Sequence, residues 1–114
     1  MSNYKPDRWV VIKITPPDRS PVYKVFGSWY GDYDHGDRWR TNSGIVKAVD
    51  DVLGKEVYFH GTSGSVYTCN YDAYGMTCYG SDVLKEMIAA SFEHNGTVVE
   101  IVSEDSNFTG LNYV

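Results

Sequence analysis

Residues 22–45 read VYKVFGSWY, GDYDHGD and RWRTNSGI, which are two aromatic runs joined by an acidic turn that contains glycine. Successive side chains of a strand point to opposite faces, so the rings of Tyr23 and Trp29 are expected on one face. The rings of Phe26 and Tyr30 are expected on the other. Ring surface on both faces needs a core or a partner to cover it. The stretch therefore predicts a small aromatic β-rich domain, but no residue pattern in it fixes a reaction.

The chain is 114 residues long, a length that fits one domain covering residues 1–114. It contains ten tyrosines and eleven glycines but only three leucines, a composition that favours strands and turns over helix bundles. The net charge is −5, and ten of the fifteen acidic residues lie after residue 40. This balance disfavours general binding to nucleic acid, because such binding depends on clustered lysine and arginine.

The cellular location is predicted from two absences in the sequence. Residues 1–8 lack the apolar segment that a secretory signal needs, and no apolar run approaches the ~20 residues of a membrane span. We therefore expect a cytoplasmic protein that does not enter a membrane. In that compartment Cys69 and Cys78 are expected to stay reduced.

Short runs of β-branched and aromatic residues, separated by glycine and proline, predict strands along most of the chain. The predicted strands are residues 9–14, 22–30, 38–49, 57–60, 65–69 and 97–102. The third is expected to bend or bulge at Gly44, because a glycine inside a strand commonly marks such an irregularity. The fourth and fifth are expected to form a hairpin around a loop whose glycines can adopt positive φ.

One helix is predicted over residues 82–93, with Ser81 as its N-cap and Asn95-Gly96 at its end. Residues 103–114 are expected to be a frayed end or an edge strand. The fold class predicted is α+β. It is a twisted antiparallel sheet, or a partly open small barrel, of five or six strands with the helix packed on it.

The acidic turn places Asp32, Asp34 and Asp37 within six residues, the composition of a calcium loop. The spacing fails, because an EF-hand loop starting at Asp32 needs glycine at its sixth position and glutamate at its twelfth, where this chain has Asp37 and Ser43. The histidines and cysteines also lack the paired spacing of a zinc site. We therefore predict a solvated turn without metal, no cofactor and no catalytic residue, with Cys69 as a small buried side chain.

The sequence Arg38-Trp39-Arg40 is followed by Asn42, so guanidinium groups and an amide alternate along one predicted strand. If Arg38, Arg40 and Asn42 share the exposed face, that face can hold a carboxylate or a phosphate. Trp39 then points inward. A solvated strand face without a ligand is the competing interpretation.

The motifs GDRWRTNSGI at residues 36–45, SGSVY at 63–67 and YG at 74–75 resemble small uncharacterised accessory proteins of tailed, myovirus-type phages of marine bacteria. The similar stretch runs from about residue 23 to residue 87. No activity is assigned to that family, so the resemblance transfers no catalytic residue. It implies a phage-encoded accessory protein of the host cell cytosol.

Two functions stay open at the level of sequence. The first is a small non-enzymatic binding or regulatory protein that acts on a host or phage protein, or forms a homodimer, with Trp29 and Tyr30 as anchors. The alternative is a small-molecule or nucleotide-binding domain, including an enzyme. In that case Arg38, Arg40 and Asn42 hold an anionic group, and Tyr67 or Trp39 stacks on the ligand.

Overall fold

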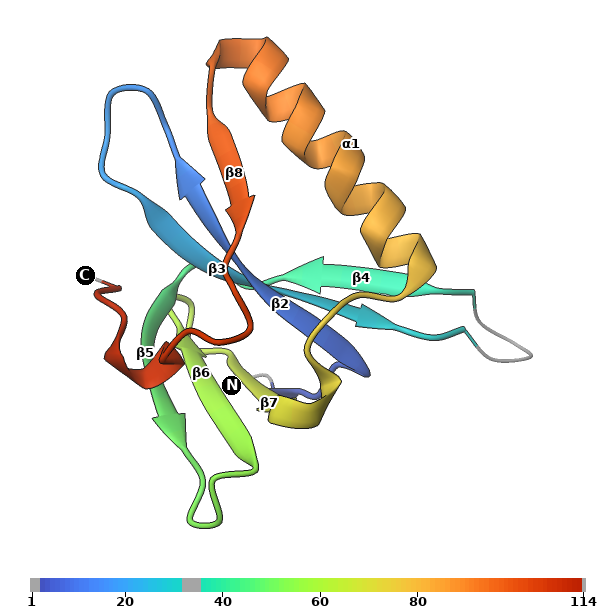
Figure 1. Ribbon diagram of the computed structural model, residues 1–114, viewed down its shortest axis with the longest axis vertical. Helices are drawn as coiled ribbons and strands as arrows, with labels where there is room; N and C mark the ends of the chain where they lie inside the picture. Colours follow the sequence, from blue (N-terminus) through green and yellow to red (C-terminus); the bar gives the residue numbers. More distant parts are fainter. Residues whose placement is uncertain (1–2, 32–35, 114) are drawn as a thin grey trace.

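The computed structural model describes residues 3–31 and 36–113. Within these residues the chain forms eight strands, one α-helix and two short 3-10 helices. In chain order they are β1 (Asn3–Tyr4), β2 (Arg8–Thr15), β3 (Val22–Trp29), β4 (Arg38–Thr41), β5 (Ile45–Asp50), β6 (Glu56–Gly61), β7 (Val66–Asn70), η1 (Tyr71–Ala73), α1 (Cys78–Asn95), β8 (Val98–Ile101) and η2 (Phe108–Gly110). The fold class is α+β, as the sequence predicts (Figure 1).

The strands form two four-stranded sheets rather than one. Sheet 1 has the strand order β1-β7-β6-β5, and sheet 2 has the order β4-β3-β2-β8. Neighbouring strands are antiparallel, except that β1 runs parallel to β7. The sheets are not closed into a barrel, so the prediction of a single sheet or barrel of five or six strands is corrected to two open sheets.

The correction originates in residues 38–49, which the sequence presents as one strand. In the structure β4 ends at Thr41, and β5 begins at Ile45 in the other sheet. Gly44, where the sequence predicts a bend or bulge, has a φ of 139°, a conformation that other residues rarely adopt. Residues 42–44 therefore carry the chain from sheet 2 to sheet 1, and we call this segment the crossing.

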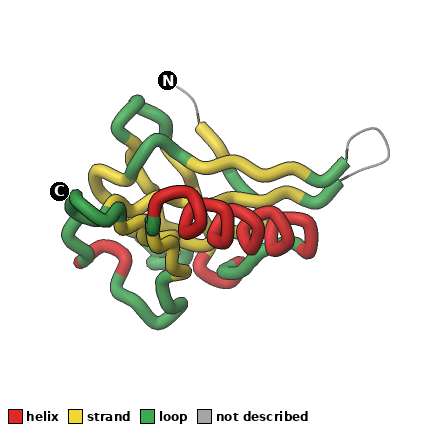
Figure 2. The backbone as a smooth tube through the Cα atoms, turned by 90° about the horizontal axis from the view of Figure 1, so that it is seen from above, coloured by secondary structure: helices red, strands yellow, loops and turns green. Residues whose placement is uncertain are grey.

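Sheet 2 is the middle layer of the protein, because its strand β2 is buried on both faces. Trp9 and Val11 pack in one core with side chains of sheet 1. Val10 and Ile12 pack in a second core with Leu84 of α1. Figure 2 shows α1 lying lengthwise along the strands. A strand covered on both sides needs a continuous apolar run, and the sequence WVVI supplies it.

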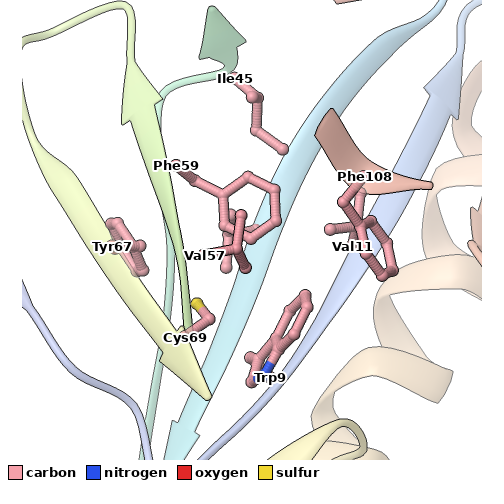
Figure 3. Close-up of a cluster of buried hydrophobic side chains, with 9 residues drawn as sticks. Trp9, Val11, Ile45, Val57, Phe59, Tyr67, Cys69 and Phe108 are labelled. Carbon is pink, nitrogen blue, oxygen red and sulfur yellow. The ribbon is translucent and has the colours of Figure 1, made fainter. Parts of the chain in front are cut away.

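The core between the two sheets is organised around Trp9. The centroid of its ring lies 5.5 Å from that of Phe59, 4.7 Å from that of Tyr74 and 5.3 Å from that of Phe108. Its indole nitrogen donates a hydrogen bond to the carbonyl oxygen of Asn70 at 2.6 Å. Figure 3 shows Trp9 beside side chains that come from strands of both sheets and from η2. The buried indole is thus both packed and hydrogen-bonded.

The helix begins four residues earlier than the sequence predicts. Thr77, not Ser81, is the N-cap, and its side chain accepts a hydrogen bond from the Gly80 amide at 3.0 Å. A Cβ at Gly80 would lie 2.9 Å from the Cβ of Ser28, so glycine allows α1 to approach sheet 2 closely. The predicted end of the helix is confirmed, because Asn95 is its last residue and Gly96 caps it in the left-handed conformation.

The C-terminal residues fold back onto the core instead of forming an edge strand or a frayed end. Phe108 of η2 is 2 % exposed and belongs to the core between the sheets. The hydroxyl of Tyr113 donates a hydrogen bond to the Phe108 carbonyl. Leu111 and Tyr113 also pack against this core, and the Tyr113 ring lies edge-on to Tyr23 with the centroids 5.4 Å apart. Side-chain packing around the buried Phe108 ring therefore attaches the described end of the chain to the domain.

We expect the substitution Phe108→Ala to lower the free energy of unfolding by about 3–5 kcal/mol, because it removes a fully buried ring and leaves a cavity. Urea denaturation followed by tryptophan fluorescence measures the change. Phe92→Ala on α1 is the matched control, since the Phe92 side chain is 62 % exposed. The control should stay within about 0.5 kcal/mol of the parent protein. Equal effects of the two variants would contradict the buried position of Phe108.

Candidate functional site

Strand β4 lies at the edge of sheet 2 and presents its two arginines on one face. Its partner strand pairs Trp29 with Arg38 and Gly27 with Arg40. The Arg38 guanidinium carbon lies 5.9 Å from the centroid of the Trp29 ring. The Arg40 guanidinium carbon lies 4.6 Å from the centroid of Tyr4, which belongs to β1 of sheet 1. The Arg40 side chain therefore reaches from sheet 2 to sheet 1, where a cation–π contact with Tyr4 holds it.

Trp39 lies on the opposite face of β4, the side that faces the helix. Its ring stacks on Phe26, with the centroids 5.5 Å apart and the planes at 11°. The side chain nevertheless keeps 38 % of its surface exposed. Trp39 is therefore packed on one side against Phe26 of the second core, and the rest of its ring is exposed to solvent.

A first hollow of about 340 Å³ opens between β1 and β4. It is lined by Asn3, Tyr4, Lys5, Trp29, Arg38, Trp39 and Arg40. Lys5 is already engaged in an ion pair with Glu56 at 3.2 Å. In the described part of the chain neither Arg38 nor Arg40 forms an ion pair, so their charges face the hollow and the solvent.

Asn42 is buried, which corrects the prediction that it shares an exposed face with Arg38 and Arg40. Its exposed fraction is 5 %. The backbone amide of Asn42 donates to the Val25 carbonyl at 3.2 Å, and the side-chain oxygen of Asn42 accepts from the Val25 amide at 2.9 Å. The side chain thus takes the place of the backbone carbonyl in the ladder as the chain turns towards sheet 1. The physical reason for the burial is this hydrogen bond to β3.

Tyr67 of β7 lies on the other side of the same region, in sheet 1. Its ring packs against Tyr4 with centroids 4.9 Å apart, and the residue is 1 % exposed. Its hydroxyl makes no hydrogen bond of good geometry with any described residue. Burial raises the pKa of Tyr67 to about 12, although the nearby Arg40 charge acts in the opposite direction. The hydroxyl therefore stays protonated at neutral pH.

A second hollow of about 200 Å³ lies where the crossing passes the β6–β7 turn. It is lined by Arg40, Thr41, Asn42, Ser43, Ser63, Ser65 and Tyr67. Its hydroxyl groups are linked, because Ser43 Oγ accepts from the Ser63 amide at 3.0 Å and bonds Ser63 Oγ at 3.1 Å. Arg40 lines both hollows, so the two lie next to each other on either side of its side chain.

The structure distributes the sequence-predicted residues over these two hollows. Trp29, Arg38 and Trp39 line the first, Asn42 and Tyr67 line the second, and Arg40 lines both. Tyr30 lines neither hollow and is 57 % exposed at the end of β3.

Sequence reasoning missed Tyr4 and the serines of the second hollow. Tyr4 lies in a strand of only two residues, which is too short to show a period. The sequence places Ser63 in the predicted hairpin loop and Ser65 at the start of the following strand, and the structure brings both hydroxyls to the crossing. The one available signal was that this turn contains two serines in addition to the glycine that a turn requires.

The metal and thiol predictions concern other parts of the chain. Asp32, Asp34 and His35 lie outside the described residues. Among residues 3–31 and 36–113, no group of three or more His, Cys, Asp or Glu side chains is arranged to hold a metal ion. Cys69 is fully buried, as predicted, and its burial raises the pKa of the thiol well above its usual range.

No family model, curated protein sequence or solved structure matches the chain. Over the residues that the structure describes, no helix combines the length and the apolar character needed to cross a membrane. The candidate site is consequently defined by its own geometry.

We expect Asn42→Ala to lower the free energy of unfolding by about 1–3 kcal/mol, because the buried Val25 amide loses its acceptor. Thermal and urea denaturation measure the difference. Asn112→Ala is the control, since Asn112 is exposed near the C-terminus, and it should change stability by less than about 0.5 kcal/mol. An Asn42→Ala variant as stable as the parent would mean that the crossing does not depend on this hydrogen bond.

Proposed function

We propose that this chain is a small cytosolic, non-enzymatic binding protein that docks onto another protein. The docking surface consists of Trp29, Tyr30, Arg38, Trp39 and Arg40, and we call it the Arg–Trp surface. The observation that supports the proposal is the exposure of the Tyr30 and Trp39 rings beside Arg38 and Arg40, and neither arginine forms an ion pair with a described residue. All four residues lie on or next to strands at one edge of sheet 2. Tryptophan, tyrosine and arginine are the residues enriched among binding hot spots.

Contacts within the free protein order most side chains of the Arg–Trp surface. Arg38 lies over Trp29, Arg40 lies over Tyr4, and Trp39 stacks on Phe26. The indole nitrogen of Trp29 also donates to the Lys5 carbonyl at 3.1 Å. Side chains that are ordered in the free protein lose less entropy on binding, so a partner gains more net affinity from the same contacts.

The chemistry of the Arg–Trp surface favours a partner with an acidic, extended segment. Arg38 and Arg40 supply positive charge, and carboxylates form paired hydrogen bonds with guanidinium groups. Because β4 is an edge strand, its outer backbone groups can pair with a strand from the partner. The resemblance to phage accessory proteins adds that the partner is a protein of the phage or of its host. A second copy of this acidic chain is the remaining candidate.

The test compares which proteins the parent and its variants capture from a lysate of bacteria infected by a myovirus-type phage. Tyr30→Ala and Arg38→Ala alter exposed parts of the Arg–Trp surface, whereas Tyr79→Ala and Lys85→Ala change the same classes of residue on α1. We expect at least one protein that the parent and both α1 variants capture and that both surface variants lose. Calorimetry with that purified protein should then give at least ~30-fold weaker binding for Arg38→Ala, the loss typical of a hot spot.

Two results would contradict the proposal. One is a captured set that is identical for the parent, Tyr30→Ala and Arg38→Ala. The other is a protein lost equally by the surface variants and by Tyr79→Ala, which would point to a different face. Sedimentation of the parent alone decides whether the partner is a second copy, because a dimer that Arg38→Ala dissociates assigns the Arg–Trp surface to self-association.

A further inference from the structure

We infer that the second hollow is a binding site for an oxyanion group, a phosphate or a carboxylate, held by Arg40, Asn42 and Tyr67. The inference goes beyond the proposed protein docking, because it concerns a polar hollow beside the Arg–Trp surface and needs no protein partner. Three of the residues that line the hollow carry hydrogen-bond donors of different kinds: the guanidinium of Arg40, the side-chain amide of Asn42 and the phenolic hydroxyl of Tyr67.

The orientation of the Asn42 side chain is fixed by the backbone. Its oxygen accepts from the Val25 amide at 2.9 Å, so the amide nitrogen Nδ2 must point the other way. Nδ2 is buried and has no hydrogen-bond acceptor among the described residues. The hydrogen bond that shapes the crossing therefore leaves an unpaired buried donor on a residue that lines the hollow.

Tyr67 presents a second buried donor from the opposite sheet. The residue is 1 % exposed, and the Arg40 guanidinium lies close enough to act on its hydroxyl oxygen, but the hydroxyl proton is donated to no acceptor within the described part of the chain. A buried hydroxyl proton without an acceptor is costly, and phenylalanine would fill the same space without that cost. A hydroxyl in this position is explained if it donates to a bound group.

Arg40 gives the hollow its charge. Its guanidinium is held over Tyr4 and is close enough to Tyr67 to act on the ionisation of the phenol. In the described residues it has no carboxylate partner. The remaining lining consists of Thr41 and three serines, and no acidic side chain among them opposes an anion.

The balance of donors and acceptors distinguishes an oxyanion from a neutral guest. Arg40 and the Asn42 amide nitrogen can only donate, so the group between them must accept at several positions. Phosphate and carboxylate oxygens do so and also match the guanidinium charge. A water molecule accepts two hydrogen bonds and carries no charge to balance the Arg40 guanidinium. Water alone therefore satisfies the donors of the hollow less completely than an oxyanion does.

The experiment follows the side-chain NH₂ resonances of Asn42 by ¹⁵N–¹H correlation spectroscopy. The protein is titrated with sodium phosphate and, separately, with sodium acetate, while sodium chloride keeps the ionic strength constant. We expect saturable shifts of the Asn42 side-chain pair and of the Ser63 and Ser65 amides, with a dissociation constant on the order of 1 mM. The probe that binds more tightly identifies the source as a phosphate or a carboxylate group.

Two variants and one control separate a built site from a general charge effect. Tyr67→Phe removes one hydroxyl and should weaken binding about tenfold, the loss of one hydrogen bond to a charged group, without lowering the melting temperature. Arg40→Gln should weaken it by at least about the same factor. Lys85→Gln removes one positive charge on α1 and should leave the affinity unchanged.

The inference is overturned if neither phosphate nor acetate produces saturable shifts. It is also overturned if the affinity is the same in the parent, Tyr67→Phe and Arg40→Gln, which would indicate an adventitious ion only. Both outcomes are read from the protein alone and are independent of whether a protein partner is found.

Discussion

The two hydrogen bonds between Asn42 and Val25 constrain the rest of the structure. They continue the register of β4 with β3 one residue past the end of β4, by one backbone bond and one side-chain bond. Because the side chain completes the ladder, the backbone is free to turn, and Gly44 then directs it into sheet 1. The two sheets are thereby joined over three residues, and their relative position near β4 depends on this crossing.

The same hydrogen bonds bury a polar side chain beside the second hollow. An asparagine that uses its oxygen to complete a strand carries an amide nitrogen into the protein with it. The second hollow, which Asn42 lines, is also lined by Tyr67, by the serines of the β6–β7 turn and by Arg40. Buried polar groups without partners destabilise the fold, and this cost is the physical basis of the proposal that the second hollow holds an oxyanion.

Much of the fold is legible in the sequence, and the reasons are local. The WVVI run indicates that β2 is a strand covered on both faces. Apolar and aromatic residues on both faces of β3 indicate that this strand is covered on both faces as well. Gly44 marks the place where the third predicted strand breaks. The division into two sheets is not legible, because only residues 42–44 separate the two strand-like runs, and a glycine in so short a segment is equally consistent with a bulge within one strand. The start of α1 is hidden by Gly80, which resembles a loop residue but permits close packing on Ser28.

The candidate site could be predicted only in part for a related reason. Arg38, Arg40 and Asn42 were selected as donors in one strand, and side-chain chemistry alone justifies that choice. Their separation into two hollows depends on Tyr4 of β1 and on Ser65 of the β6–β7 turn. These residues reach the site because the strands of sheet 1 pair over long distances in the sequence. No spacing within the sequence reports such a contact between distant strands.

The central claim is that the crossing builds an oxyanion site between the two sheets. A high-resolution crystal structure of the parent protein, from crystals soaked in selenate, tests it most directly, because the anomalous signal of selenium locates the anion. The account predicts a selenium peak in the second hollow, with oxygens within hydrogen-bond distance of Asn42 Nδ2, the Tyr67 hydroxyl and the Arg40 guanidinium. Ordered water in that hollow, with selenium only at other sites, would contradict it.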